Sequence, residues 1–147
     1  MSLLPRKALL AIAAVVDVAL HARDRPVSAK ALAARHTLPP RHLEPVLQAL
    51  VHEGILRGVR GPHGGYVLAR ERDHIGIDEI VRAAATVRDH DEDAIASPLI
   101  ADVISPAVAE AERAFSGALS RINVDDLARR VEADGRRAGS DEIDFTI

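Results

Sequence analysis

The chain of 147 residues contains no cysteine and no tryptophan, and aromatic residues make up only 2% of it. The absence of thiols excludes disulfides, thiolate nucleophiles, cysteine-built zinc sites and cysteine-ligated iron–sulfur clusters. The chain also lacks a long apolar run, because Arg6, Lys7 and Asp17 interrupt the most apolar stretch, residues 3–20, which has no secretory cleavage pattern. We therefore expect a cytoplasmic protein with no membrane segment and no cofactor.

Charge is distributed unevenly, although the formal net charge is only −3. Residues 1–70 carry ten Lys or Arg against four Asp or Glu, a balance of +6. Residues 71–147 carry nine against eighteen, a balance of −9. A basic half joined to an acidic half indicates a part that binds a polyanion and a part that has another task.

The N-terminal half has the spacing of consecutive helices. Apolar residues recur at three- and four-residue steps over residues 3–21, which predicts a long first helix. Ser28 is placed as the N-cap of a short second helix over residues 29–35. Pro39 and Pro40 suit the entry of a third helix. Helices joined by a short turn are typical of a helix-turn-helix unit.

The third helix is predicted to bury one face and to end at Gly54, a residue that favours a left-handed terminator. Pro45 lies inside it, where a backbone donor is normally needed, so we expect the helix to begin late or to bend there. Its apolar face consists of Leu43, Val46, Leu47, Leu50 and Val51.

Beyond Gly54 the pattern changes to that of a β-hairpin, or wing. Two β-compatible runs, residues 55–60 and 66–70, flank a glycine-rich loop at residues 61–65. Helical spacing returns over residues 75–85. The order of these elements predicts a winged helix-turn-helix domain.

The acidic half is predicted to hold a packed helix seam. Ser105 and Pro106 start or kink this helix. With little other core nearby, we expect the seam to pack against a second copy of itself, although its coiled-coil spacing also suits an intramolecular core. The seam residues are Ile104, Val108, Ala111, Phe115, Ala118 and Ile122.

These patterns predict a mainly α fold with a small β-hairpin, in which a winged helix-turn-helix domain is followed by a long C-terminal dimerisation helix. The C-terminal tail alternates apolar and polar residues from 143 to 147, which is the pattern of a short strand that could dock on an edge strand or a partner, with a frayed end as the alternative. We divide the chain into a DNA-binding domain (1–85), an acidic linker or loop (86–98), dimerisation helices (99–131) and a tail (132–147).

Four ordered segments resemble the Rrf-two family of bacterial winged-helix transcription regulators: HLE at 42–44, GVRGPHGGYVLAR at 58–70, DEIVRA at 78–83 and NVDDLA at 123–128. The resemblance runs from about residue 9 to residue 131. It implies a homodimer, usually a repressor, that binds a pseudo-palindromic operator. The family includes regulators of iron–sulfur assembly, nitric-oxide response, iron response and cysteine metabolism. Several of them hold a cluster on three cysteines, which this chain lacks.

The N-terminal end of the third helix is the expected base-reading element, with Arg41, His42 and Glu44 facing outward. Arg41 suits donation to guanine, and Glu44 suits acceptance from cytosine N4. The alternatives are that Arg41 is a solvated charge, that Glu44 only stabilises the helix N-terminus, and that His42 is a spacer.

The wing is expected to reach the minor groove or its flanking phosphates. Its glycines permit close approach of the backbone, but they could equally serve only to turn the hairpin, with Arg60 solvated and His63 a spacer. The wing candidates are Arg60, Gly61, His63, Gly64 and Gly65. Residues expected to position phosphates are Ser28, Lys30, Arg35 and Thr37.

We therefore predict a transcriptional regulator, a homodimeric repressor that binds double-stranded operator DNA through residues 39–53 and the wing at 55–70. The sequence has no nucleophile constellation, P-loop or metal-binding His pair, so we expect no enzyme and no metal site. Two alternatives stay open: a winged-helix module that binds protein, and a metal-responsive regulator that uses His and the acidic run at 89–93. An unidentified effector also stays open.

Overall fold

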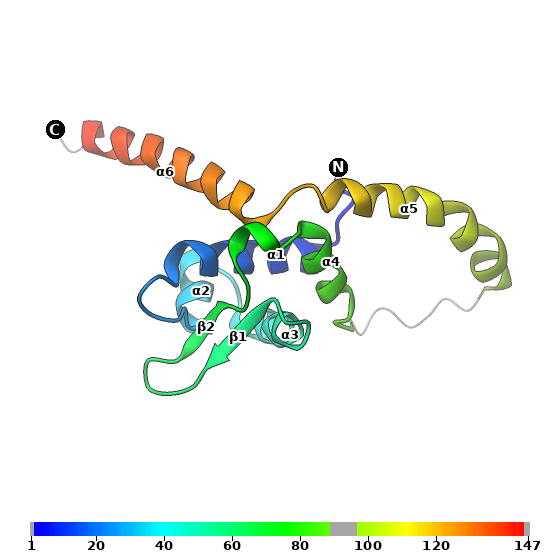
Figure 1. The fold of residues 1–147 in the computed structure, drawn as a ribbon, viewed down its shortest axis with the longest axis horizontal. Coiled ribbons are helices and arrows are strands. Elements are labelled where there is room, and N and C mark those ends of the chain that lie inside the picture. Colours follow the sequence, from blue (N-terminus) through cyan, green and yellow to red (C-terminus); the bar gives the residue numbers. More distant parts are fainter. Residues whose placement is uncertain (1, 89–96, 146–147) are drawn as a thin grey trace.

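The computed structural model describes residues 2–88 and 97–145, with side chains described as far as residue 135. The predicted mainly α fold with a small hairpin is confirmed (Figure 1). No helix in the described ranges is long and apolar enough to cross a membrane. The helices are α1 (Arg6–His21), α2 (Ala29–His36), α3 (Pro40–His52), α4 (Ile77–Ala85), α5 (Ser105–Leu119) and α6 (Val124–Phe145). The other elements are β1 (Leu56–Val59), β2 (Gly65–Leu68), a 3-10 turn η1 (Arg72–His74) and a π turn η2 (Ile100–Ile104).

The core lies where α1, α3 and α4 meet, and α2 covers one side of it. Leu43, Leu47 and Leu50 of α3 are fully buried against this core. Removing such side chains from water is the main stabilising contribution to a domain of this size. The predicted face is wrong at Val51, whose side chain is 38% exposed because it lies at the edge of the α3 stripe.

The turn between α2 and α3 is closed by backbone hydrogen bonds. Thr37 adopts the left-handed conformation, with φ 53° and ψ 48°, and Leu38 N–H donates to the carbonyl of Ala33 over 2.9 Å. This arrangement satisfies carbonyls that the end of α2 leaves free. Helix α3 begins directly afterwards at Pro40, so a late start caused by Pro45 is wrong. Pro45 is exposed and lies within the helix.

The hairpin is joined to the start of α2 as well as to itself. β1 and β2 are antiparallel, with Gly58 opposite Tyr66 and Val59 opposite Gly65. Val27 extends this pairing, since it donates to Tyr66 over 3.0 Å and accepts from Tyr66 over 2.8 Å. The wing is therefore held against the segment that precedes the helix-turn-helix unit.

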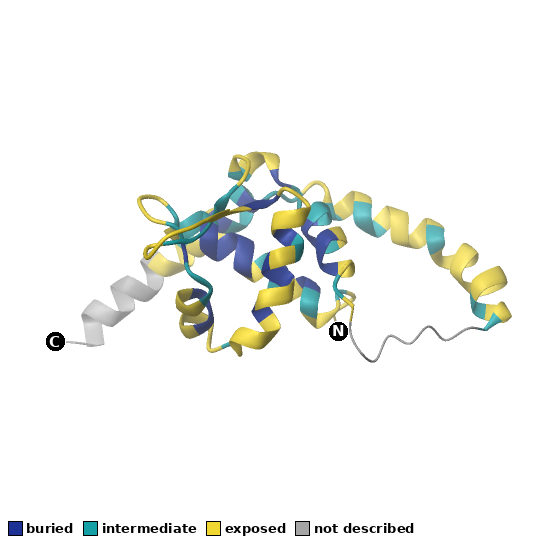
Figure 2. Ribbon diagram, turned by 90° about the horizontal axis from the view of Figure 1, so that it is seen from below, coloured by how far each residue is buried: buried dark blue, intermediate teal, exposed yellow. Residues whose placement is uncertain are grey.

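Helix α5 forms an arm that projects from the packed domain (Figure 1). The arm begins with the π turn η2. Pro106 has no N–H for the carbonyl of Asp102, and its ring crowds that carbonyl, which explains the irregular turn. No described side chain of α5 is fully buried, and Figure 2 shows the arm coloured mainly as exposed.

Helix α6 starts at a reciprocal cap. Asn123 Oδ1 accepts from the Asp126 N–H over 2.9 Å, and an Asp126 carboxylate oxygen accepts from the Asn123 N–H over 3.0 Å. The helix continues to Phe145, so the predicted strand in the tail is wrong because helix continuation outweighs a short alternation. The acidic run at 89–93 and residues 146–147 lie outside the described residues.

Candidate nucleic-acid interface

The first two turns of α3 present three polar side chains to solvent. Arg41, His42 and Glu44 are all exposed, whereas Leu43 and Leu47 between and after them are buried. The buried leucines fix the rotation of the helix about its axis. A guanidinium and a carboxylate on one exposed helix surface are the groups that bind guanine and cytosine edges in a major groove.

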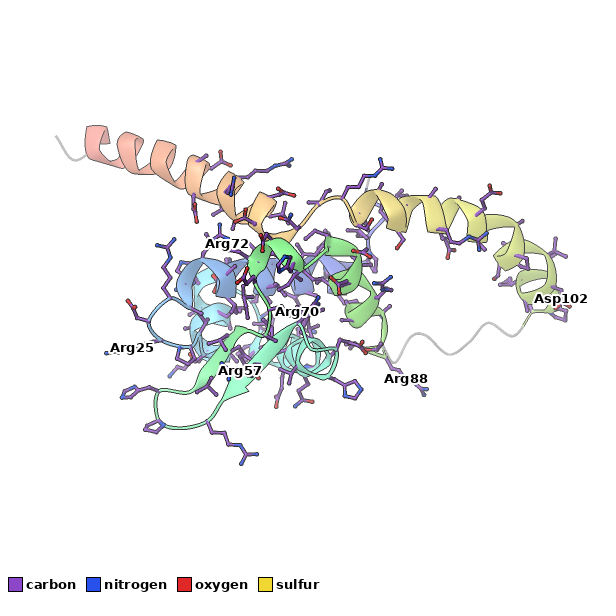
Figure 3. The ribbon with its side chains drawn as sticks, in the orientation of Figure 1. Arg25, Arg57, Arg70, Arg72, Arg88 and Asp102 are labelled. Atoms are coloured by element: carbon purple, nitrogen blue, oxygen red, sulfur yellow. The ribbon has the colours of Figure 1, made fainter. Side chains whose placement is uncertain are left out.

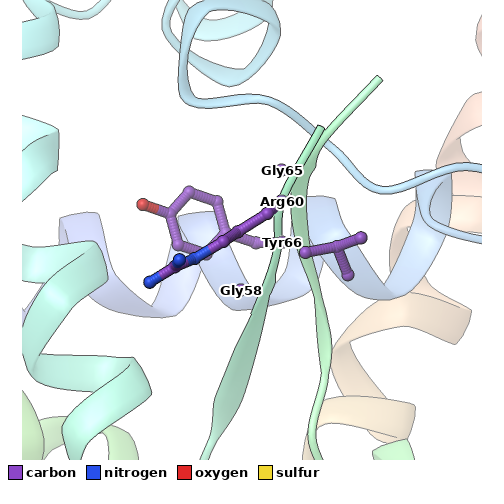
Figure 4. Close-up of a pocket in the computed structure, with 5 residues that line it drawn as sticks. Gly58, Arg60, Gly65 and Tyr66 are labelled. Atoms are coloured by element: carbon purple, nitrogen blue, oxygen red, sulfur yellow. The ribbon is translucent and has the colours of Figure 1, made fainter. Parts of the chain in front are cut away.

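The wing presents a second polar group beside α3 (Figure 1). Arg60 and His63 are exposed in and next to the loop between the strands. The register places Arg60 and Tyr66 on the same face of the hairpin, and their side chains extend in parallel in the open hollow shown in Figure 4. Gly58 and Gly65 also line this hollow, so few side-chain atoms limit access to the guanidinium.

Two wing glycines have a structural task that the sequence left open. A Cβ atom on Gly65 would collide with the carbonyl oxygen of Val27, and one on Gly64 would collide with that of Val59. Gly61 instead has φ 125° with open space around its Cβ position. Gly64 and Gly65 are therefore required for the shape of the wing, whatever they contact outside the protein.

The residues predicted to position phosphates lie around α2, but they differ in whether their side chains are already hydrogen-bonded within the protein. Lys30 and Thr37 are exposed. The Ser28 hydroxyl accepts from the Ala31 N–H over 3.0 Å and so caps α2, as predicted. The Arg35 guanidinium already has an intramolecular partner, because it donates to both carboxylate oxygens of Asp17.

Sequence reasoning missed Asp17, which organises this region. Its side chain is 1% exposed and accepts from Arg35 Nε over 2.8 Å, with His36 Nε2 lying 2.7 Å from the same oxygen. His21 Nδ1 lies 3.3 Å from that oxygen. The available signal was a single acid between valines of an apolar helix, with Arg35 and His36 as possible partners one helix later.

A second ion pair joins the end of the wing to α4. Arg70, just after β2, donates to Glu79 of α4 over 2.9 Å, and the Gly76 N–H donates to the same carboxylate over 2.9 Å. Burial alone would raise the pKa of Glu79, but these hydrogen bonds and the charges of Arg70 and Arg82 outweigh it, so this pKa lies below its usual value.

Only part of the predicted seam lies along one helix as a continuous apolar stripe. Ile104 and Val108 are both 43% exposed, Ala111 and Ala118 are exposed, and Phe115 is half-buried. The seam does not continue to Ile122 along one helix, because α5 ends at Leu119. Ile122 packs on the domain core, and its carbonyl accepts from the Ile77 N–H over 2.9 Å.

The two halves of the chain differ in net charge, and several cations of the basic half are exposed around the wing. Figure 3 shows Arg25 and Arg57 near the wing, whereas Asp102 lies at the far end of the arm. Arg57 and Arg60 of the wing and Arg41 of α3 are all exposed cations. A concentration of positive charge on one side is the electrostatic signature of a nucleic-acid surface.

A family model described as "Rrf2: Iron-dependent Transcriptional regulator" matches residues 4–130. This chain belongs to the Rrf2 family. The match covers every element from α1 to the first turns of α6, including the turn, the wing and the arm. The resemblance to that family predicted from the wing motif is confirmed.

The relatives of this Rrf2 protein include proteins named as transcriptional regulators. It is 35% identical to the HTH-type transcriptional regulator IscR of Xenorhabdus nematophila over 80 residues, which is 54% of this chain and 49% of that protein. It is 29% identical to Protein rrf2 of Nitratidesulfovibrio vulgaris over 119 residues, 78% of this chain and 79% of that one. The solved structure of T. potens IscR aligns over 89% of both chains, with TM-score 0.68 and 27% identity. This chain spans about half the length of the curated IscR proteins that it matches.

The family description names iron. Whether an iron centre fits this Rrf2 protein depends on the metal-ligating side chains that it contains. The 147 residues contain no cysteine, and a cysteine-ligated iron–sulfur cluster therefore does not fit them. Glu71, Asp73 and His74 bring three donor atoms together, but all three residues are exposed, and exposed acidic groups are common without a metal.

Proposed function

We propose that this Rrf2 protein is a DNA-binding transcriptional regulator that acts in the bacterial cytoplasm as a homodimeric repressor. The observation that carries the proposal is the exposed set Arg41, His42 and Glu44 on α3, a helix that lies beside strand β1 of the wing. Membership of a family of transcriptional regulators supports the same function. The DNA-binding domain covers residues 1–85 and the dimerisation helices cover residues 99–131, with a linker between them and a tail after them.

DNA binding would combine two kinds of contact. The basic half releases counterions from the phosphate backbone, which supplies affinity without sequence preference. Arg41 and Glu44 then read base edges in the major groove, and Arg60 enters the minor groove or binds its flanking phosphates. Ser28, Lys30 and Thr37 position the backbone near α2, while Asp17 holds Arg35.

Pairing of two copies would determine how two half-sites are read. The uncovered apolar side chains of the α5 arm support a second copy as their partner, since stripes of this length are rarely left in water. A two-fold pair of α3 helices reads half-sites about 34 Å apart, one turn of DNA. The operator is then pseudo-palindromic.

Selection from a pool of random duplexes, followed by titration of the enriched duplex at several salt concentrations, tests this function. We expect one enriched sequence with related half-sites and an affinity that falls steeply with salt. Absence of enrichment together with salt-independent binding would overturn the proposal. Binding to a protein partner in place of DNA would then favour the interaction-module alternative.

A further inference from the structure

Asp17 is the single charged side chain that is buried within residues 2–88 and 97–135. Its two carboxylate oxygens accept from Arg35 over 2.8 and 3.1 Å, which is a two-point contact. His36 Nε2 lies 2.7 Å from one of them. His21, one turn further along α1, lies 3.3 Å from the same oxygen. The surrounding groups thus come from α1 itself and from the end of α2.

A buried carboxylate is stable only while such partners are in place. A two-point contact between guanidinium and carboxylate also fixes the relative orientation of the two groups, because both are planar. Asp17 therefore fixes the end of α2 against α1. Removing the carboxylate releases this constraint without removing any apolar core residue.

The fixed residues stand directly before the turn that leads to α3. Arg35 and His36 precede Thr37, a non-glycine residue with positive φ, and α3 begins at Pro40. Only a short segment thus separates the Asp17 contacts from Arg41. The Asp17 contacts therefore also constrain the orientation of the first turn of α3.

Arg35 also has an electrostatic consequence. Its side chain is 37% exposed, so once released from Asp17 it can reach solvent or a phosphate group. While it is bound, its charge is compensated by the carboxylate. Asp17 therefore removes one cation from the basic half that would otherwise bind any DNA sequence equally.

We propose that Asp17 is a specificity-determining positioning residue, which holds the turn between α2 and α3 for base reading and keeps the Arg35 guanidinium away from the phosphate backbone. The inference rests on the proposed DNA-binding function. It assigns Asp17 no contact with DNA. Its effect is on the ratio between the affinity for the selected duplex and the affinity for any other duplex.

The test compares the full-length wild type with Asp17→Asn on two probes: the duplex enriched by the wild type from a random pool, and a scrambled duplex of equal length. We expect the affinity of Asp17→Asn for the enriched duplex to fall about tenfold or more. Its binding to the scrambled duplex is expected to be retained, with a salt dependence steeper by about one released counterion because Arg35 is free. Asp125→Asn is the matched control, since it breaks an Arg72 contact of 2.7 Å at the start of α6 and is expected to leave the ratio unchanged.

Arg35→Gln provides a second measurement if Asp17→Asn fails to fold at the assay temperature. It breaks the same contact from the more exposed side, and we expect the ratio to fall without a steeper salt dependence. A ratio equal to that of the wild type in a folded variant would overturn the inference while the proposed function stands. A wild type that prefers no duplex would overturn both.

Discussion

The region before residue 88 and the α5 arm differ in where they place their apolar side chains. In the first region, α1, α3 and α4 bury their apolar faces against one another. In the arm no described residue of α5 is buried, and Ile104 and Val108 are each 43% exposed. The first region forms a packed core together with the start of α6, where Val124 is fully buried, whereas most of the α5 stripe stays uncovered. Folding and assembly are therefore assigned to different parts of one chain.

The largest expected effect comes from placing a charge in the arm. Val108→Asp is expected to leave the domain folded, because Val108 contributes nothing to the domain core. It should prevent pairing and so lower affinity for the selected duplex by about 100-fold, because two linked half-site contacts become one. Sedimentation and DNA titration measure the two effects.

Arg113→Asp is the control for that variant, since it places a carboxylate at an exposed α5 position outside the stripe. We expect the wild-type oligomeric state and DNA affinity for it. Equal behaviour of the two variants would remove the stripe from the pairing surface.

The next largest expected effect is a difference in stability between two glycine-to-alanine variants. Gly65→Ala is expected to lower the free energy of unfolding by about 1 to 3 kcal/mol, because the new Cβ atom has no space beside Val27. Gly117→Ala in α5 meets open space and should raise helix stability by about 0.5 to 1 kcal/mol. Chemical denaturation measures both, and a stable Gly65→Ala variant would contradict the close packing of the wing.

Arg60→Ala tests the basic region on the DNA side. We expect affinity for the selected duplex to fall about tenfold and the number of released counterions to fall by about one, with thermal unfolding unchanged. Arg113→Ala, on the arm, is the matched removal of a cation and is expected to change neither quantity. An unaltered affinity for Arg60→Ala at unaltered stability would remove Arg60 from the interface.

The smallest expected effect is the acid dependence that Glu79 contributes. Because its pKa is lower when folded than its usual value of 4.5, its contribution is complete above about pH 5 and is lost as pH falls through the folded pKa. Glu79→Gln should therefore be less stable than the wild type near neutral pH, with a difference that shrinks in acid. Denaturation of the wild type and of Glu79→Gln at several pH values measures this difference, and a difference that does not shrink in acid would contradict the assignment.

Local sequence patterns predicted the parts of this fold that depend on neighbouring residues. The burial of Leu43 and Leu47, the cap at Ser28 and the terminator at Gly54 all follow from spacing within one element, and each is confirmed. The motif at the wing also predicted the family correctly. Short-range periodicity and end signals are sufficient for such features.

The features that the sequence did not reveal depend on contacts between distant residues. Asp17 meets Arg35 only after α1 and α2 pack, so its position between valines indicates burial but does not identify its partner. Ile122 continues the heptad spacing but joins the core through Ile77, because α5 ends before it. The tail alternates as a strand does but continues α6. In each case tertiary packing or helix continuation outweighs the local pattern.

The mass of the complex between the full chain and the selected duplex tests the account most directly, because it joins DNA reading to pairing. We predict two chains on a duplex with two half-sites about one helical turn apart, and loss of that complex in Val108→Asp at concentrations that saturate the wild type. A single wild-type chain bound to one half-site, with the same affinity in Val108→Asp, would contradict the division between a DNA-reading region and a pairing arm.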